Sequence, residues 1–484
     1  MLHEATVDSI HAAFAAGELT CVELVRSCLA RIEAWDRQGP ALRALITVNP
    51  DALEIAADMD RQYRAKGGRV GSLHGIPLVL KDNIETADLP TSGGNVAMRA
   101  FRPAADAFTV ARLREAGALV LAKANLQEFA RGGLSTSGLG GQVLNPYDLT
   151  RTPGGSSGGT GAAIAAGYAV LGVGSDTGQS IRSPASACSL VGVRPTRGLV
   201  SRGGLMPNSF TQDEVGPITR TVKDAARMLD VMAGYDRGDP VTALGVGRRP
   251  ASYVGALAGA TLQGARIGVM TTLLGGLARH TQVNAVMEQV VRNMQAQGAH
   301  LQRFDLPGYE ELAGRVSTDR HEARAATDRY FAGRQAPFAS LRQVVESRTA
   351  SPAIQQQLEA ELAVEDGLGD PDYKDRMLTR DKLRQMLLVA MADLGLDAIL
   401  YPLQRVLVAP VGESEQAERN GALSHGTGMP AVTFPGGFSA ATASAPLGVP
   451  VGVELLGREF SEATLLSLAH AYEVACPTRR PPAL

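Results

Sequence analysis

The stretch RTPGGSSGGTGAAIAAGYAVLGVGSDTGQSIRSPASACSLVGVRPTR spans Arg151–Arg197 and decides which fold the chain can adopt. Its residues are mostly Gly, Ser, Thr and Ala, which are too small for an ordinary core segment. Two serine-centred turns, Gly154–Gly159 and Asp176–Ile181, flank a run of small apolar residues, Gly161–Gly174. Because glycine permits positive φ and close backbone approach, serines at such turns can be held beside several converging backbone N–H groups. The stretch therefore suits a nucleophile with an oxyanion hole.

Composition and charge limit the class of protein. The 484 residues are 45% hydrophobic and 20% charged, as expected for a globular protein with a sizeable core. A chain of this length often has about three domains, although one large α/β fold can also fill it. The formal net charge of −2 gives no indication of a nucleic acid or an anionic membrane as a partner.

Neither the cysteines nor the first residues indicate a secreted protein. No pair of cysteines has CxxC spacing, so we predict free, mostly buried thiols at Cys21, Cys28, Cys188 and Cys476. The opening residues, MLHEATVDSIHAAF, contain acidic side chains and no apolar core of the signal-peptide type. No run approaches the ~20 apolar residues that cross a membrane. We therefore expect a cytoplasmic protein.

Helical and strand patterns alternate along most of the chain. A capping box at Thr20–Glu23 opens an amphipathic helix that reaches Trp35. The pattern then predicts helices at 51–64, 106–115, 282–295 and 462–474, and strands at 44–48, 76–80, 118–123, 265–270, 299–304, 398–401, 431–434 and 450–456. This alternation indicates a sheet with helices on both faces. Between Tyr309 and Met391 strands disappear, and we interpret this segment as a helical insertion over one face of the sheet.

Particular residues argue against three alternative functions of the chain. A phosphate-binding loop requires a lysine that the glycine run does not contain. Gly154-x-Ser156-x-Gly158 matches the α/β-hydrolase elbow, but that elbow must follow a strand, and Asn145–Pro153 reads as a loop. The scattered histidines and unpaired cysteines offer no zinc site. A simpler alternative remains open, in which a tight glycine turn packs a helix onto the sheet and the serines only cap it.

A lysine at the end of an apolar strand favours the catalytic interpretation. Lys81 follows Ile-Pro-Leu-Val-Leu directly, so its amine can be buried. A lysine can activate a serine hydroxyl only if it is desolvated enough to be neutral.

The chain resembles the amidase signature family of serine hydrolases. The resemblance rests on an ordered set of motifs, densest between about 75 and 234, namely Gly75–Ile84, Pro153–Gly159, Gly174–Ala185, Gly192–Thr196, Gly216–Arg220, Gly428–Val432 and Val449–Gly457. It implies a single domain over residues 1–484, of α/β/α type, with a central mixed twisted sheet. The helical segment at about 309–391 has no counterpart in these motifs.

The resemblance also implies the catalytic residues. It gives Lys81 as the base, Ser156 as a serine with a cis peptide bond, and Ser180 as the nucleophile. The oxyanion hole would be formed by backbone N–H groups of the turn Thr177, Gly178, Gln179 and Ser180. Ser157 would support Lys81. Asp176 and Arg182 would be local orienting groups, and the backbone near Ala130 would line the leaving-group side.

Two positions depart from the family pattern. The residue before the nucleophile is usually Gly, and here it is Gln179. Its side chain could reach the acyl pocket, which makes it the first candidate for a substrate-selecting residue; the alternative is a side chain that points into the core or the solvent and has only a structural effect. His425 stands where the family more often has Asn, so a role for it is open, although a histidine of the turn without a catalytic role is the simpler interpretation.

We expect an amidase that cleaves a carbon–nitrogen acyl bond without a metal or cofactor. The substrate would be a small amide, with aryl amides, ureas and carbamates (urethanes) as variants, and the enzyme would be a monomer or homodimer. The alternative is the amidase-like subunit of a glutamine-dependent amidotransferase, which works with partner subunits.

The acyl pocket should be formed by the loop Gly132–Gly141, the turn Leu205–Phe210, the helical segment and Leu403–Ser424. From the Leu, Val, Met and Phe in these pieces we expect a medium-sized, largely apolar pocket.

Overall fold

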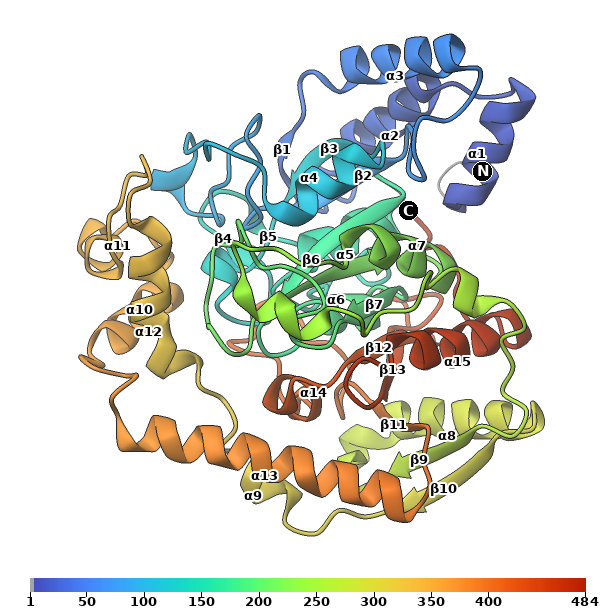
Figure 1. Cartoon of the computed structure of the whole chain (residues 1–484), viewed down its shortest axis with the longest axis vertical. Helices are drawn as coiled ribbons and strands as arrows, with labels where there is room; N and C mark the ends of the chain where they lie inside the picture. The colour runs from blue at the N-terminus through green and yellow to red at the C-terminus, as the bar shows by residue number, and fades with distance from the viewer. Residues whose placement is uncertain (1–3) are drawn as a thin grey trace.

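The computed structural model describes residues 4–484 as one α/β domain built on an eleven-stranded sheet (Figure 1). The strand order is β1-β3-β2-β6-β8-β7-β12-β13-β11-β9-β10. The strands are β1 Leu45–Val48, β2 Pro77–Lys81, β3 Leu119–Ala124, β6 Leu171–Asp176, β7 Val191–Arg194, β8 Glu214–Thr219, β9 Arg266–Met270, β10 His300–Phe304, β11 Ala398–Pro402, β12 Ala431–Phe438 and β13 Pro450–Leu456. A separate hairpin pairs β4 Thr136–Ser137 with β5 Gly141–Gln142.

The sheet is mixed, as predicted. Strands β3, β2 and β6 run parallel at one end, and β11, β9 and β10 run parallel at the other. Between these groups, from β6 to β11, each neighbouring pair is antiparallel. The carboxyl ends of parallel strands lie at the same edge, so the ends of β2 and β6 are brought together.

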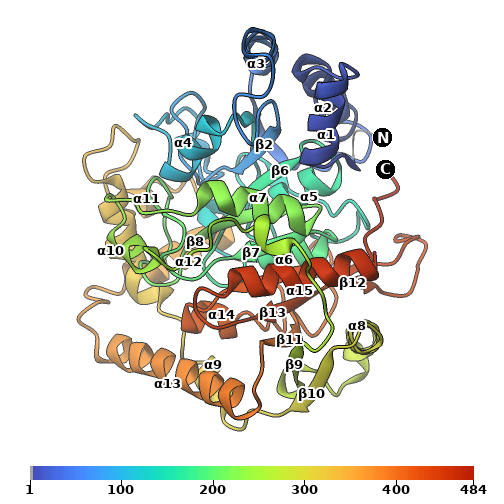
Figure 2. The ribbon, with the colours of Figure 1, turned by 45° about the vertical axis from the view of Figure 1, so that its right-hand side comes forward.

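Helices cover both faces of the sheet (Figure 2). Neighbouring residues on a strand point to opposite faces. On β12, Phe434 packs on Tyr472 of α15, whereas Thr433 hydrogen-bonds Glu454, which pairs with Arg182 of α6. Helices α6 and α15 therefore lie on opposite faces.

The helices are α1 Val7–Ala16, α2 Cys21–Trp35, α3 Ala52–Lys66, α4 Phe108–Glu115, α5 Gly158–Ala165, α6 Arg182–Ala187, α7 Val222–Met232, α8 Thr281–Ala296, α9 Tyr309–Ala313, α10 Asp319–Phe331, α11 Leu341–Ser347, α12 Pro352–Leu362, α13 Pro371–Asp393, α14 Ala422–Thr427 and α15 Glu462–Ala475.

The small residues of the central stretch allow close packing. Helix α5 begins directly after the first serine turn and is buried throughout. A Cβ atom at Gly159 would collide with the backbone carbonyl oxygens of Asn125 and Ala44, so only glycine fits there. Residues 145–157 contain no strand, which confirms that the first serine does not follow one, as an α/β-hydrolase elbow would require.

Each predicted strand is present, and the segment from Tyr309 to Met391 contains only helices, α9 to α13. Helix α1, which the pattern did not predict, is capped by Thr6 and Ser9. Strands β6, β7 and β8 were also missed, because the sequences LGVGSD, VGVR and EVGPIT are short and include Gly or Pro.

Two further expectations concern the whole chain. Cys21, Cys28 and Cys188 are buried free thiols, and Cys476 is a half-buried one, as predicted. None of the helices between residues 4 and 484 combines the length and the apolar character needed to cross a bilayer.

Candidate active site

Lys81 ends β2 in a completely buried position between two serines. Its Nζ atom lies 2.7 Å from Ser156 Oγ, 2.8 Å from Ser175 Oγ and 3.2 Å from the carbonyl oxygen of Ser175. The pairing of β2 with β6 in parallel, with Leu80 beside Val173, brings Lys81 next to Ser175. Burial disfavours the ammonium and lowers the pKa of Lys81 to about 7, although Asp176 and Asp213 oppose this shift.

These three contacts suit an ammonium, which has three N–H donors, and equally suit a neutral amine. A neutral amine has two N–H groups and one lone pair. The carbonyl and the hydroxyl of Ser175 can accept the two N–H groups, and the lone pair then faces Ser156 Oγ. Asn83 Nδ2 also donates to Ser175 Oγ, at 3.0 Å, and fixes this hydroxyl. The arrangement allows Lys81 to take a proton from Ser156.

A second buried lysine does not reach the serines. The Nζ atom of Lys123, on β3, contacts Thr91 Oγ1 at 2.8 Å and lies 3.5 Å from Asp82 Oδ1. Only Lys81 of the two is therefore placed to act on Ser156.

The peptide bond between Gly155 and Ser156 is cis, as the resemblance implies. The backbone oxygen of Ser156 accepts a hydrogen bond from the N–H of Gln127, which fixes the first serine turn against the loop after β3. Ser157 supports Lys81 only indirectly, because its Oγ donates to the carbonyl oxygen of Ser175 at 3.2 Å.

The second serine turn has all its carbonyl oxygens occupied and its N–H groups free. The carbonyls of Thr177, Gly178, Gln179 and Ser180 accept hydrogen bonds from Gln212 Nε2, Arg182 Nη2, Ser183 N and Ser157 N. Over residues 4–484, none of the four backbone N–H groups has a protein acceptor. In a trans peptide the C=O and N–H groups point in opposite directions. Each fixed carbonyl therefore turns the N–H group of the next residue away from the partner of that carbonyl.

A buried charge cluster fixes this turn. Arg182 donates through Nε to Asp176 Oδ2 at 3.1 Å, through Nη1 to Glu454 Oε1 at 2.8 Å and through Nη2 to Gly178 O at 2.5 Å. Arg194 Nη1 reaches Asp176 Oδ1 at 2.8 Å. Burial alone would raise the pKa of Asp176, but the two guanidinium groups hold it well below its usual value. The orienting groups predicted at Asp176 and Arg182 thus contact the turn directly.

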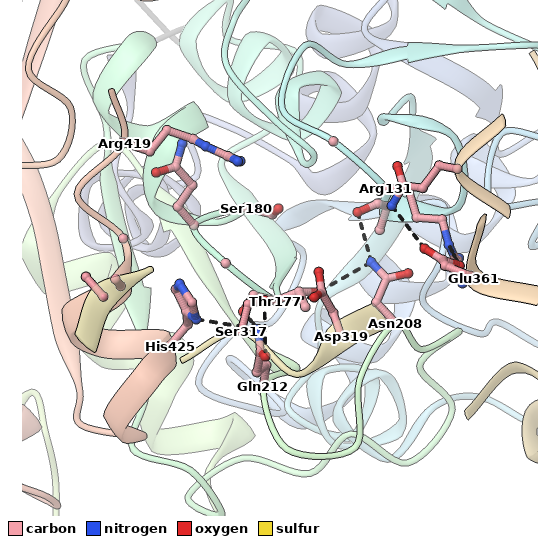
Figure 3. A pocket seen from close by; sticks show the side chains of 18 residues that line it. Arg131, Thr177, Ser180, Asn208, Gln212, Ser317, Asp319, Glu361, Arg419 and His425 are labelled. Atoms are coloured by element: carbon pink, nitrogen blue, oxygen red, sulfur yellow. Dashed lines mark hydrogen bonds and ion pairs between the residues drawn. The ribbon is translucent and has the colours of Figure 1, made fainter. Parts of the chain in front are cut away.

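Ser180 opens onto a cavity of about 280 Å³. The structure gives no hydrogen bond between Ser156 Oγ and Ser180 Oγ within the described chain, although the backbone contact between Ser157 and Ser180 keeps the two turns adjacent. Figure 3 shows Ser180 between Arg419 on one side and Arg131, Asn208 and Glu361 on the other. The lining residues are Ala130, Arg131, Gly132, Thr177, Gly178, Gln179, Ser180, Asn208, Gln212, Ala313, Ser317, Asp319, Gln357, Glu361, Arg419, Gly421, Ala422 and His425.

The expected apolar character of this pocket is wrong. Apart from Ala and Gly, the lining residues are all polar or charged, and they include the buried ion pair of Arg131 with Glu361 at 2.8 Å. Each of the four predicted segments does contribute to the wall. Their Leu, Val, Met and Phe side chains point elsewhere: Met206 and Phe331, for example, pack together in a separate core.

Two polar residues that sequence reasoning missed connect the pieces of the wall. Gln212 donates to Thr177 O at 3.3 Å and accepts from Thr318 Oγ1 at 2.7 Å, so it links the second serine turn to the start of α10. Asn208 Nδ2 donates to Ala130 O at 2.9 Å. No local motif surrounds either residue, and only the folded chain brings them to the site.

The two departures from the family pattern also lie at the cavity. Gln179 is 2% exposed, and neither of its side-chain amide atoms has a partner among the residues described. His425, on α14, approaches Gln212 Nε2 through Nδ1 at 3.4 Å. Burial, with help from Arg194 and Arg182, lowers the pKa of His425 well below its usual value, so the ring is neutral.

The chain is similar over almost its whole length to known amide-cleaving proteins. It is 33% identical to the A subunit of the glutamyl-tRNA(Gln) amidotransferase of Chloroflexus aggregans, over 99% of this chain and 98% of that protein. The peptide amidase of Stenotrophomonas maltophilia superposes with a TM-score of 0.88 at 37% identity, covering 99% and 98% of the two chains. The corresponding amidotransferase subunit of Thermotoga maritima gives a TM-score of 0.76 at 27% identity, covering 100% and 98%.

The family model for amidases matches residues 23–466, which include both serine turns and the lysine strand. Members of the group with solved structures share the sheet described above. The buried lysine, the cis serine and the second serine turn are thus part of a fold and sequence pattern that extends over the whole chain, and the protein belongs to the amidase signature family of amide-hydrolysing enzymes.

Proposed function

We propose that this enzyme hydrolyses a carbon–nitrogen acyl bond through an acyl-enzyme on Ser180, with Lys81 as the base and Ser156 as the proton relay. The observation that carries the proposal is the 2.7 Å contact between the buried Lys81 amine and Ser156 Oγ. An amine with a pKa of about 7 is neutral in a large fraction of molecules at neutral pH, as a base must be.

In the acylation step, the Ser180 oxygen attacks the carbonyl carbon while its proton passes to Ser156 Oγ, whose own proton passes to Lys81 Nζ. A bond forms between Ser180 Oγ and carbon, and the carbonyl π pair moves to the oxygen. The free N–H groups of the turn Thr177–Ser180 would stabilise this oxyanion. The Ser180 side chain must rotate toward Ser156 for the transfer, and such contacts often tighten only when substrate is bound.

Collapse of this intermediate requires a proton on the leaving nitrogen, because an amide anion is a very poor leaving group. Ser156 donates its proton to that nitrogen and regains one from the Lys81 ammonium, and the carbon–nitrogen bond breaks. Water then attacks the acyl-enzyme with the same groups acting in reverse, which releases the acid and restores Ser180.

The leaving group would lie along the loop that follows β3. Ser156 is the proton donor to the leaving nitrogen, and its backbone oxygen is bonded to Gln127 of that loop. Ala130, three residues further on, lines the cavity. Asp176, Arg182 and Ser157 act as positioning residues, since their contacts reach the turn and the Ser175 carbonyl rather than the reacting atoms.

A small linear amide is the first substrate class to test, with aryl amides and carbamates (urethanes) as variants. The higher TM-score with the peptide amidase than with the amidotransferase subunit supports a stand-alone hydrolase. A cytoplasmic location and a monomeric or homodimeric state remain predictions.

A second candidate is the glutaminase subunit of a glutamine-dependent amidotransferase, which 33% identity over 99% of the chain favours. The two functions differ in their need for partners. Release of ammonia from glutamine that appears only when partner subunits are added would support the second candidate.

The test of the first candidate is a panel of aliphatic amides, anilides and carbamates assayed with the wild type and with Ser180→Ala. We expect turnover of at least one class by the isolated wild type and a loss of roughly 10⁴-fold or more in kcat for the variant. Retained turnover in Ser180→Ala would remove Ser180 from its proposed role.

A further inference from the structure

The carboxamide of Gln179 is a buried polar group without a partner at the wall of the active-site cavity. Its residue is 2% exposed, and both Oε1 and Nε2 lack hydrogen-bond partners in the described part of the chain. Buried polar side chains are nearly always hydrogen-bonded, because an unsatisfied one retains its full desolvation cost. Since Gln179 lines the cavity directly before the nucleophile, a bound substrate is the natural partner.

Gln179 rests against the segment that carries Arg419, whereas the loop after β3 carries Arg131, and Figure 3 shows these two arginines on opposite sides of Ser180. A Cβ atom added to Gly421, in the loop before α14, would lie 3.3 Å from Gln179 Oε1 and 2.5 Å from Gly178 O. The side chain therefore rests against Gly421, whose lack of a side chain leaves room for it. The leaving group, by contrast, is expected beside the loop after β3, because Ser156 contacts that loop. Gln179 is thus positioned to meet the acyl part of a substrate.

The chemistry of the group points to a neutral partner. A carboxamide offers two N–H donors and one acceptor oxygen. A carboxylate would satisfy only the donors, and an ammonium only the acceptor. An acyl chain that carries both a C=O and an N–H within a few bonds of the scissile carbonyl can satisfy both atoms. An N-acylated aminoacyl group has this pattern, and the polar walls of the cavity suit it better than an alkyl or aryl chain.

We propose that Gln179 is a specificity-determining residue that binds a peptide group in the acyl part of the substrate, so that N-acylated amino-acid amides are preferred over simple alkyl amides. This inference depends on the proposed acyl-enzyme at Ser180 and adds the substrate class. The backbone of Gln179 serves the oxyanion turn, and its side chain selects the acyl chain.

The test compares two amides of similar shape, N-acetyl-L-alaninamide and 2,4-dimethylpentanamide, in which CH2 and CH–CH3 replace the N–H and the C=O of the peptide group. In the wild type we expect kcat/KM to favour the first by about 10- to 100-fold, the range for a hydrogen bond that is either made or left unsatisfied. In Gln179→Met, which keeps the volume and removes both polar atoms, this ratio should fall to within about threefold of one, because neither amide then leaves a buried partner unsatisfied. The ratio of kcat/KM for the two amides is taken within one variant, so a general effect of the substitution on the turn changes both values equally and does not alter the ratio.

Gln357→Met is the matched control. It removes another carboxamide of the same cavity, whose Nε2 already donates to Glu361 at 3.0 Å, so the wild-type ratio should persist. If Gln179→Met is inactive, Gln179→Ala gives the same readout. A wild-type ratio near one, or an unchanged ratio in the Gln179 variants, would overturn the inference. Failure of the acyl-enzyme proposal has a different signature, namely hydrolysis of both amides by Ser180→Ala.

Discussion

Arg182 Nη2 donates to the backbone oxygen of Gly178 at 2.5 Å, and this contact sets the direction of the neighbouring N–H group. With the carbonyl held by the guanidinium, the N–H of Gln179 must point the other way, since the peptide is trans. Arg182 is itself fixed by Asp176 and Glu454, all buried. A buried charge cluster on one side of the turn thus sets the direction of an N–H group in the proposed oxyanion hole.

Replacement of Arg182 by Met should therefore reduce both stability and rate. Removal of one partner from a buried ion cluster costs about 3–5 kcal/mol. Loss of an oriented oxyanion donor costs about 10²- to 10³-fold in kcat. Urea unfolding and steady-state kinetics measure the two effects. Lys123→Met is the control: it also removes one partner of a buried ion pair, with Asp82, but Lys123 does not contact the turn, so the loss of stability should be similar and the loss of kcat much smaller. Equal losses of kcat would contradict the role of Arg182.

The rate should increase with pH through the neutral range. Burial lowers the pKa of Lys81 to about 7, so the amine is protonated below that pH and neutral above it. Only the neutral amine can accept a proton, so kcat/KM should rise about tenfold per pH unit on the acid side and level off at alkaline pH. A flat profile between about pH 5 and 7, or one that falls toward alkaline pH, would contradict Lys81 as the base.

Ser175 should set the pH range over which kcat/KM rises, that is, the acid limb of the pH profile. Its hydroxyl accepts from Lys81 Nζ at 2.8 Å, and such a bond is stronger to an ammonium than to a neutral amine. Ser175→Ala should therefore lower the pKa of Lys81 further and move the limb to lower pH. Loss of orientation should reduce kcat by about tenfold, the value of one hydrogen bond. Ser175→Thr keeps the hydroxyl and should retain the limb. An unmoved limb in Ser175→Ala would make the contact merely structural.

The ion pair between Arg131 and Glu361 should stabilise the packing of the helical segment 309–391 against the rest of the domain. It joins the loop after β3 to α12 across 2.8 Å, with both side chains buried. Each single change, Arg131→Met or Glu361→Leu, should lower the free energy of unfolding by about 3–5 kcal/mol, because it leaves a buried charge unpaired. The double variant should lose clearly less than the sum, as a double-mutant cycle in urea would detect. Additive losses would mean that the two charges are not coupled.

Much of the site could be predicted because its signals are local. Lys81 follows five apolar residues, so its burial at a strand end could be predicted. Both serine turns contain several glycines close to the serine, so they could also be recognised from the local sequence. The contact of Lys81 with Ser175 was not readable, because it depends on the pairing of β2 with β6. Ser175 lies inside a predicted motif, but nothing in that motif marks its hydroxyl as a partner of the lysine.

The cavity wall was the least predictable part, since it is assembled from distant segments. Arg131, Asn208, Gln357 and Arg419 lie in four different parts of the chain, and no spacing links them. The Leu, Val, Met and Phe of the same segments suggested an apolar pocket, but those side chains do not line the cavity: many pack into the core, and others, such as Leu378 and Val389, are exposed. In an irregular loop or a short helix, sequence pattern alone does not say which side of the segment faces the substrate.

The most direct test of the proposed mechanism is to identify the residue that carries the acyl group during turnover. A 4-nitrophenyl ester needs no proton on its leaving group, so it should acylate the wild-type enzyme faster than water removes the acyl group, and an acid quench followed by peptide mass spectrometry locates the adduct. We predict the mass of the acyl group on the peptide that contains Ser180, and its absence in Ser180→Ala. An adduct on another residue, or none in an enzyme that is turning over substrate, would contradict the acyl-enzyme mechanism.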